Sequence, residues 1–227
     1  GDYAPGEGGG DGRSGDRFGR AGGELRRLRI AVIDSGVNPA HPHIECAVSG
    51  GVSIGGPDEL FLDYLGHGTA VMAAIQEKAP EAEFYAVRIF HRELRTRIEW
   101  VTRGIEWCLE EGMDLANLSL GTVNGAHREV FEGLVERGLR QGTTIVSARR
   151  MQEREALPGS LAGVVGVEED ATLGRGEWRR EGDVYWGSPH PRPIPGVPAE
   201  RNLKGISFAV ANVTGLLARE RLGTGHL

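Results

Sequence analysis

Residues 28–36 read LRIAVIDSG, an almost unbroken apolar run that ends in Asp34, Ser35 and Gly36. Continuous Ile, Ala and Val over this length predict a strand that is buried on both faces, as in a parallel sheet. Beyond this strand, short apolar runs alternate with amphipathic stretches of helical period, which is the pattern of βαβ units. We therefore expect an α/β fold with a mainly parallel central sheet.

The same pattern places the other elements. The expected strands cover residues 28–34, 83–90, 114–120, 143–148 and 164–167, and the expected helices cover residues 69–78, 97–111, 127–141 and 207–222. After Trp178 the chain becomes Pro-rich through GSPHPRPIPGVPAE, residues 187–200. Proline lacks a backbone donor, so an irregular loop is expected there.

A chain of 227 residues fits a single domain. Ten of its 36 glycines lie in residues 1–23, where large apolar side chains are nearly absent. This composition predicts a disordered or loosely packed segment over residues 1–23 and one folded domain over residues 24–227.

Composition excludes several classes of function. The 26 basic and 32 acidic side chains leave a net charge of −6, which argues against a nucleic-acid partner. No apolar run approaches the roughly 20 residues of a membrane span, and no signal peptide is visible, so a cytoplasmic protein without a membrane partner is expected. Cys46 and Cys108 fit no metal-ligand spacing, and no cofactor is expected. The turn after residue 34 lacks the glycines of a dinucleotide site.

Three polar residues stand where expected elements begin or end, each with a glycine within two residues. Asp34 ends the first strand, His67 lies in the stretch GHGT before the helix at residue 69, and Ser207 lies in the stretch GISFA through which the last helix begins. Singly, each is an ordinary helix cap or structural residue. Together, Asp, His and Ser are the three parts of a nucleophilic triad, in which His67 activates the Ser207 hydroxyl and Asp34 orients the imidazole.

The chain order Asp, His, Ser differs from that of α/β-hydrolases and of chymotrypsin-like enzymes. With the stretch NLSLG at residues 117–121, these motifs resemble those of the subtilisin-like serine proteases, the subtilases. The resemblance covers most of residues 28–220. It implies a three-layer subtilisin-like fold and hydrolysis of peptide bonds.

The resemblance also implies a substrate site. An extended peptide would pair with the strand that contains Leu118, Ser119, Leu120 and Gly121. Two residues of the following strand, Ser147 and Ala148, are assigned to the same site. Asp63, four residues before His67, matches a position that is commonly acidic in subtilases and is expected to line the cleft.

The sequence departs from the subtilase pattern at the oxyanion site. The family supplies an Asn side chain just after the strand that here ends at Ala148, but this chain has Arg149 and Arg150 there and no Asn from residue 125 to 201. Two oxyanion donors remain candidates: one of these guanidinium groups, and the backbone N–H of Ser207 at the helix start. The alternative for the arginines is an ordinary surface pair.

A second departure lies in the last helix. Ile206 replaces the usual Thr before the serine, and Ala211 and Asn212 replace the usual Pro-His. Two functions follow. The first is a serine endopeptidase with a peptide or protein substrate, dedicated to the maturation of one such molecule and with activity that is low or dependent on a partner protein. The alternative is a pseudoprotease, a peptide-binding or regulatory subunit that keeps the fold and the groove.

Overall fold

The computed structural model describes residues 26–56 and 60–224. Eight strands form its central sheet: β1 (Arg29–Asp34), β2 (Val48–Ser53), β3 (Glu83–Arg88), β4 (Leu115–Leu118), β5 (Thr144–Ala148), β8 (Val165–Glu169), β9 (Trp178–Glu181) and β10 (Val184–Gly187). Their order is β2-β3-β1-β4-β5-β8-β10-β9. Neighbouring strands are parallel except β9 and β10, which are antiparallel. A separate two-stranded hairpin consists of β6 (Arg150–Met151) and β7 (Arg154–Glu155).

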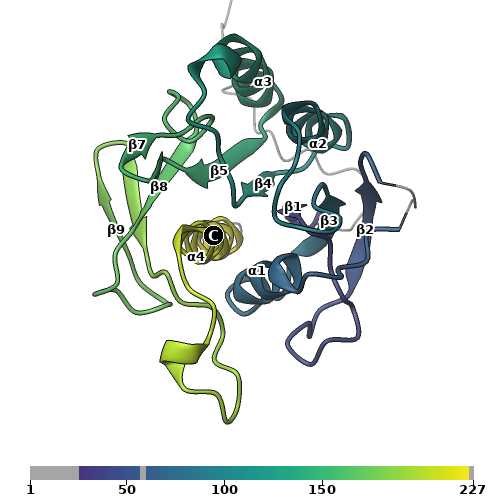
Figure 1. Cartoon of the computed structure of the whole chain (residues 1–227), viewed down its shortest axis with the longest axis vertical. Coiled ribbons are helices and arrows are strands. Elements are labelled where there is room, and N and C mark those ends of the chain that lie inside the picture. Colours follow the sequence, from purple (N-terminus) through teal and green to yellow (C-terminus); the bar gives the residue numbers. More distant parts are fainter. Residues whose placement is uncertain (1–25, 57–59, 225–227) are drawn as a thin grey trace, which may run out of the picture.

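Helices cover both faces of the sheet. Among the described residues, the α-helices are α1 (His67–Gln76), α2 (Ile98–Glu110), α3 (Arg128–Gln141) and α4 (Ile206–Thr224), with short 3₁₀ turns at Gly125–His127 and Ala199–Arg201. As Figure 1 shows, α1 and α4 lie on one face, and α2 and α3 lie on the other. Within the described part of the chain, none of these helices has the length and apolar character to cross a membrane.

The first strand shows why the sheet is buried on both faces. Ile30 and Val32 belong to the core cluster under α1 and α4, whereas Ala31 and Ile33 belong to the cluster under α2 and α3. Successive side chains of a strand point to opposite faces, so an unbroken apolar run supplies both cores. The predicted three-layer α/β fold with a mainly parallel sheet is confirmed.

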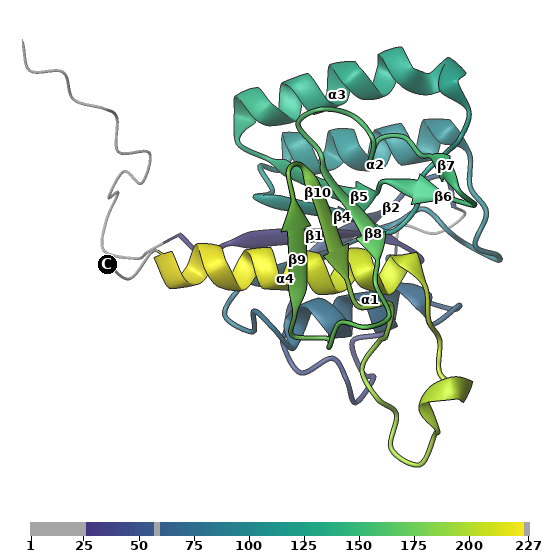
Figure 2. The same cartoon turned by 90° about the vertical axis from the view of Figure 1, so that its left-hand side faces the viewer.

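The carboxyl ends of the parallel strands and the first residues of two helices lie at one edge. In Figure 2, α4 begins on the side where the β6–β7 hairpin projects. β1 ends at Asp34, α1 begins at His67, and α4 begins at Ile206. Parallel α/β sheets carry their functional groups at this edge.

Three strands of the sheet were not predicted. β2 has the sequence VSGGVS, whose glycines hide the strand signal, and it lies at the edge of the sheet. β9 and β10 form a hairpin joined by Gly182 and Asp183, where an irregular loop was expected to follow Trp178. The loop expectation is therefore wrong up to Gly187 but holds for the Pro-rich residues beyond it. The expected segment 1–23 lies outside the described residues.

Lys78 lies just after α1 and is almost fully buried, with its aliphatic stem against Gly215 of α4. Its ammonium donates to the carbonyl of Ala74 at 2.9 Å and pairs with Glu77 at 3.3 Å. Burial outweighs these contacts and lowers the pKa of Lys78 to about 8. The charged form therefore destabilises the fold near neutral pH.

This burial predicts a pH-dependent stability. Between pH 8 and the ordinary lysine pKa of about 10.4, the unfolded chain binds the proton and the folded chain does not, so the free energy of unfolding rises with pH. Lys78→Met should therefore be more stable than the wild type at pH 7, with a difference that shrinks toward pH 10. Buried Cys108, whose raised pKa gives the opposite slope, is common to both proteins. Urea unfolding from pH 7 to 10 measures the difference; a constant difference would contradict the prediction.

Candidate active site

Asp34 and His67 form a close pair at the carboxyl edge of the sheet. The Nδ1 atom of His67 lies 2.7 Å from Oδ1 of Asp34, which also accepts the backbone N–H of Ser35 at 2.7 Å. Asp34 is completely buried, and its Oδ2 atom has no hydrogen-bond partner among the described residues. The carboxylate is therefore directed at the imidazole and at one backbone donor.

The charges around His67 favour its protonated form. Burial acts against the imidazolium, but the negative charge of Asp34, the hydrogen bond to it and the charge of Asp63 outweigh burial, so the pKa of His67 lies above its ordinary value of 6.5. An imidazole with a raised pKa is a stronger base and holds a transferred proton well. This is the electrostatic setting that a general base requires.

Asp63 holds the helix that carries His67. Its Oδ1 atom accepts the Ser35 hydroxyl and the N–H groups of Leu65 and Gly66, and its Oδ2 atom accepts both the N–H and the hydroxyl of Thr69, all at 2.6–2.9 Å. A carboxylate at a helix N-terminus satisfies free N–H groups and opposes the helix dipole. Asp63 was expected to line the cleft; in the structure it is half-buried, and both of its carboxylate oxygens accept hydrogen bonds from within the protein.

Gly68 explains why glycine follows His67. Its N–H donates to the Ser35 hydroxyl at 2.8 Å, and a Cβ atom at this position would lie 2.3 Å from the carbonyl oxygen of Gly36. Only glycine permits that approach. The glycine thus brings the first turn of α1, and His67 with it, against the end of β1.

Ser207 stands in the first turn of α4, and the residue that follows it contacts the histidine. The ring of Phe208, the residue after it, lies 5.7 Å from the His67 ring between centroids. The Ser207 hydroxyl donates to the carbonyl of Ser119 at 3.1 Å. The described contacts include no hydrogen bond between this hydroxyl and His67, so the structure brings Ser207 beside the pair without completing the triad's hydrogen bonds.

A buried polar network connects the helix that carries Ser207 to the end of β4. Thr214 of α4 donates to Oδ1 of Asn117 at 2.9 Å, and Nδ2 of Asn117 donates to the Ser119 hydroxyl at 2.9 Å. Asn117 and Thr214 are completely buried. Because buried polar groups are costly unless paired, this network fixes the end of β4 relative to α4.

A cleft of about 450 Å³ opens beside this edge. Leu120, Gly121 and Thr122, which follow β4, line one part of it, and Met151 lies on it as well. The other residues that line it are Phe90, Leu94, Arg95, Thr96, Ile98, Val101, His127, Phe131 and Leu157. The lining is mostly apolar, with Arg95 and His127 as its cationic or ionisable members.

Comparison with known proteins places this geometry in a family. The model of the subtilase family, Peptidase S8, matches residues 26–156, which is more than half of the chain and includes Asp34 and His67. The chain belongs to the subtilase family. Ser207 lies beyond the matched residues.

Curated relatives and a solved structure agree with this assignment. The chain is 32% identical over 138 residues to the minor extracellular protease Epr of Bacillus subtilis, covering 57% of this chain and 21% of Epr. It is 29% identical over 209 residues to a thermostable alkaline protease of Halalkalibacterium halodurans, covering 84% of this chain and 55% of that protein. This subtilase thus spans only part of the length of these relatives.

The fold of this subtilase also resembles that of the prenylagaramide maturation protease PagA. The two superimpose with a TM-score of 0.67 over 88% of this chain and 78% of PagA. Their sequences are 21% identical, so the likeness concerns the fold alone.

Three of the residues expected to bind substrate in this subtilase lie inside the sheet. Leu118, Ser147 and Ala148 are completely buried in β4 and β5. β4 is paired with β1 on one side and β5 on the other, so no peptide can add to it. Ser119, Leu120 and Gly121 lie beyond the paired part of the strand, and the last two line the cleft.

The two arginines have other partners than the nucleophile. The Arg149 guanidinium lies 3.6 Å from the carboxylate of Glu168 on β8, and Arg150 donates to the carbonyl of Glu153 in the β6–β7 hairpin at 2.7 Å. Neither guanidinium contacts Ser207 among the described residues. These contacts are of the kind that the surface-pair alternative predicts.

Residues 26–56 and 60–224 of this subtilase contain no group of three or more His, Cys, Asp or Glu side chains that could hold a metal ion. Sequence reasoning missed Ser35 and Thr214, whose hydroxyls act through contacts far along the chain. It noticed Asn212 only as a departure from the family pattern. The sequence did contain a signal for the role of Asn212, because it is a polar residue within the apolar stretch of α4.

Proposed function

We propose that this subtilase is a serine endopeptidase in which Ser207 is the nucleophile, His67 the general base and Asp34 the group that orients and charges His67. The observation that carries the proposal is the 2.7 Å contact between the buried Asp34 carboxylate and His67, beside a serine at a helix start. The family assignment and the adjoining cleft support it.

The proposed reaction begins with attack of Ser207 Oγ on the carbonyl carbon of a peptide bond. The hydroxyl must exchange its present acceptor, the carbonyl of Ser119, for Nε2 of His67, which takes the proton. The histidine then gives this proton to the leaving amine, which yields an acyl-enzyme ester and a free amine. A water molecule, deprotonated by the same histidine, hydrolyses the ester and regenerates Ser207.

The charge that develops on the carbonyl oxygen needs donors. Ser207 lies in the first turn of α4, where backbone N–H groups have no intrahelical acceptor and the helix dipole is positive. We assign its N–H as one oxyanion donor. The arginines' other contacts leave the expected side-chain donor unassigned, which is consistent with slow turnover.

A peptide is the substrate class that fits the cleft. Its mostly apolar lining begins directly after Ser119, the residue that contacts Ser207. A peptide that extends from the scissile bond past Leu120 and Gly121 would place an apolar side chain in this cleft. We propose one peptide or protein as the dedicated substrate.

One observation favours a second function. The Ser207 hydroxyl is bonded to Ser119 and not to His67. A subunit that binds peptides without cleaving them would keep the cleft and tolerate this arrangement. In this pseudoprotease, Ser207 would be unreactive.

A fluorophosphonate probe separates the two functions. An active Ser207 forms an Oγ–P bond, the P–F bond breaks, fluoride leaves, and His67 takes the proton. We expect one label per folded chain, located at Ser207 by peptide mass spectrometry, and no label in Ser207→Ala. Ser160→Ala, a serine outside the site, is the control that should still be labelled. A folded wild type that stays unlabelled would contradict the proposed endopeptidase function and favour the pseudoprotease.

A further inference from the structure

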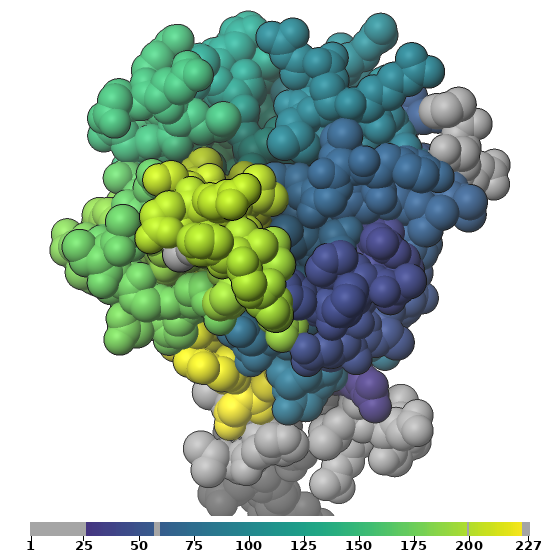
Figure 3. Space-filling view, turned by 60° about the horizontal axis from the view of Figure 1, so that its bottom comes forward, coloured from purple at the N-terminus to yellow at the C-terminus, as the bar shows by residue number. Residues whose placement is uncertain are grey.

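The segment that leads into the nucleophile is stiff. Residues 188–205 join β10 to α4 and contain five prolines, at positions 189, 191, 193, 195 and 198. Each proline fixes its own backbone angle φ, so the segment has few alternative conformations. It therefore moves largely as a unit. Figure 3 shows it on the surface, between the region of β8–β10 and the segment that follows β1.

The two ends of this segment lie together at the start of α4. The N–H of Gly205 donates to the carbonyl of Pro189 at 2.9 Å. Gly205 has φ of +135°, a value that favours glycine, and it stands two residues before Ser207. Through this hydrogen bond, a displacement of the chain at Pro189 would directly displace the first turn of α4.

Asn212 holds the same point from inside the protein. Its Nδ2 atom donates to the carbonyl of Ser188 at 2.8 Å and to that of His190 at 3.0 Å. Three successive carbonyls, of residues 188, 189 and 190, thus accept hydrogen bonds from α4 or from the residue just before it. Asn212 and Ser188 are both completely buried, so no solvent replaces these bonds.

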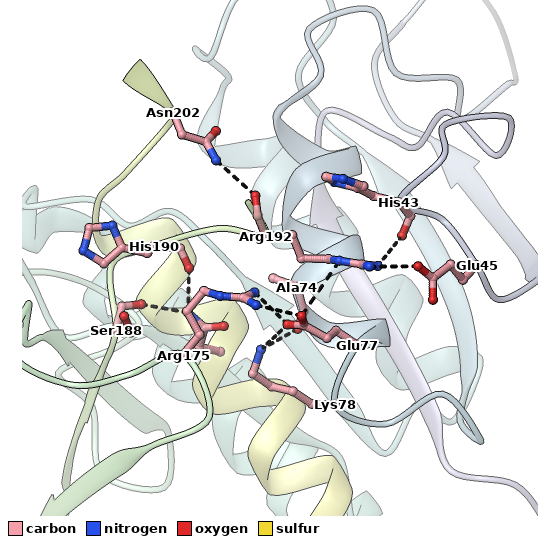
Figure 4. Close-up of polar contacts among 11 residues, drawn as sticks. His43, Glu45, Ala74, Glu77, Lys78, Arg175, Ser188, His190, Arg192 and Asn202 are labelled. Atoms are coloured by element: carbon pink, nitrogen blue, oxygen red, sulfur yellow. Dashed lines mark hydrogen bonds and ion pairs between the residues drawn. The ribbon is translucent and has the colours of Figure 1, made fainter. Parts of the chain in front are cut away.

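Arg192 connects residues 188–205 to other parts of the chain. Its guanidinium donates to the carbonyl of His43 at 3.0 Å and to the carboxylate of Glu45 at 2.8 Å, and its Nε lies 3.9 Å from Glu77. Its own carbonyl accepts Nδ2 of Asn202 at 3.0 Å, which ties the returning half of the segment to the same residue. Figure 4 shows Arg192 between Glu45 and Glu77, with Arg175 on the same Glu77 carboxylate.

We propose that Asn212 and Arg192 are positioning residues, which hold residues 188–205 so that Ser207 stands where His67 can activate it. The proposal rests on the proposed function. Neither side chain touches the reacting atoms. Asn212 acts through its hydrogen bonds to the carbonyls of residues 188 and 190 and through the hydrogen bond between Gly205 and Pro189. Arg192 acts through the stiff segment, residues 188–205, to which it belongs.

Loss of either anchor should affect the chemical step more than binding. The cleft is lined by residues from other segments, so peptide affinity stays while the serine moves. A misplacement of about 1 Å costs on the order of 10²-fold in rate. We expect Asn212→Ala to lower kcat by about 10²-fold with KM changed by less than about twofold, and Arg192→Gln to lower kcat by about tenfold.

Matched controls separate positioning from general loss of stability. Arg175→Gln removes a bidentate contact to the same Glu77 without touching residues 188–205, and should leave kcat unchanged. Thr143→Val removes a buried hydroxyl that donates to the Met113 carbonyl at the start of β5, and should lower the melting temperature without lowering kcat. Asn212→His, which keeps a ring N–H donor, should recover part of the rate.

The measurement is the second-order rate of fluorophosphonate labelling of Ser207, together with kcat and KM on a peptide and a thermal melt for each variant. Slower labelling in Asn212→Ala and Arg192→Gln, with both controls labelled at the wild-type rate, supports the proposal. Labelling of the two variants at the wild-type rate overturns it while the proposed function stands. An unlabelled wild type overturns both. Should Asn212→Ala not fold, Arg192→Gln decides.

Discussion

Replacing His67 by alanine is expected to lower kcat by about 10⁶-fold, the loss that accompanies removal of the serine or histidine of a triad in this same family. Without the imidazole, the Ser207 hydroxyl keeps its proton and its hydrogen bond to the Ser119 carbonyl. Ser207→Ala should cost as much. The double variant should be no worse than either single one, because the two residues act as a unit.

The measurement is kcat/KM on the best substrate from a fluorogenic peptide library. His91→Gln is the matched control, since His91 bonds the carbonyl of Ile54 and lies outside the candidate site. Its activity should equal that of the wild type. A His67→Ala protein within tenfold of wild-type activity would show that another group accepts the serine proton, and the proposed mechanism would fall.

The fold was predictable where one short stretch carried its own signal. β1 supplies both cores through alternate residues, and α2 and α3 have clear apolar faces. β2 escaped prediction because Gly50 and Gly51 fill the positions where strand-forming side chains would stand. It forms because β3 provides parallel backbone partners for Val48 and for Gly50–Ser53, with a register shift between them, and a reading of local sequence does not include these partners.

Only part of the candidate site was predictable from the sequence. Asp34 and His67 were found because each stands at the end of an element with a glycine within two residues, and the structure brings them to 2.7 Å. The partners of Arg149 were not predictable, because Glu168 becomes its neighbour only when β5 and β8 pair. The role of Asn212 depends likewise on carbonyls more than 20 residues earlier, at positions 188 and 190.

Asp34→Asn is expected to lower kcat by on the order of 10⁴-fold, the size of the loss that accompanies removal of the triad aspartate in this same family. In this subtilase the charge carries most of the effect. The N–H of Ser35 donates to the oxygen that faces His67, which would keep the carbonyl oxygen of the new amide in that place. The amide nitrogen would then occupy the buried Oδ2 position, which has no partner among the described residues.

The pH dependence tests this assignment. In the wild type, His67 must be neutral to act as a base, so activity should fall with decreasing pH through a pKa above 6.5. Burial is already the largest single influence on the pKa of His67, and without the Asp34 charge and hydrogen bond it is no longer outweighed. The neutral ring is then favoured, so the acid limb should move to lower pH in Asp34→Asn. Asp170→Asn, an acid at the surface between β8 and β9, should leave the limb in place. An acid limb at the same pH in Asp34→Asn and in the wild type would mean that the group titrating there is not His67 paired with Asp34.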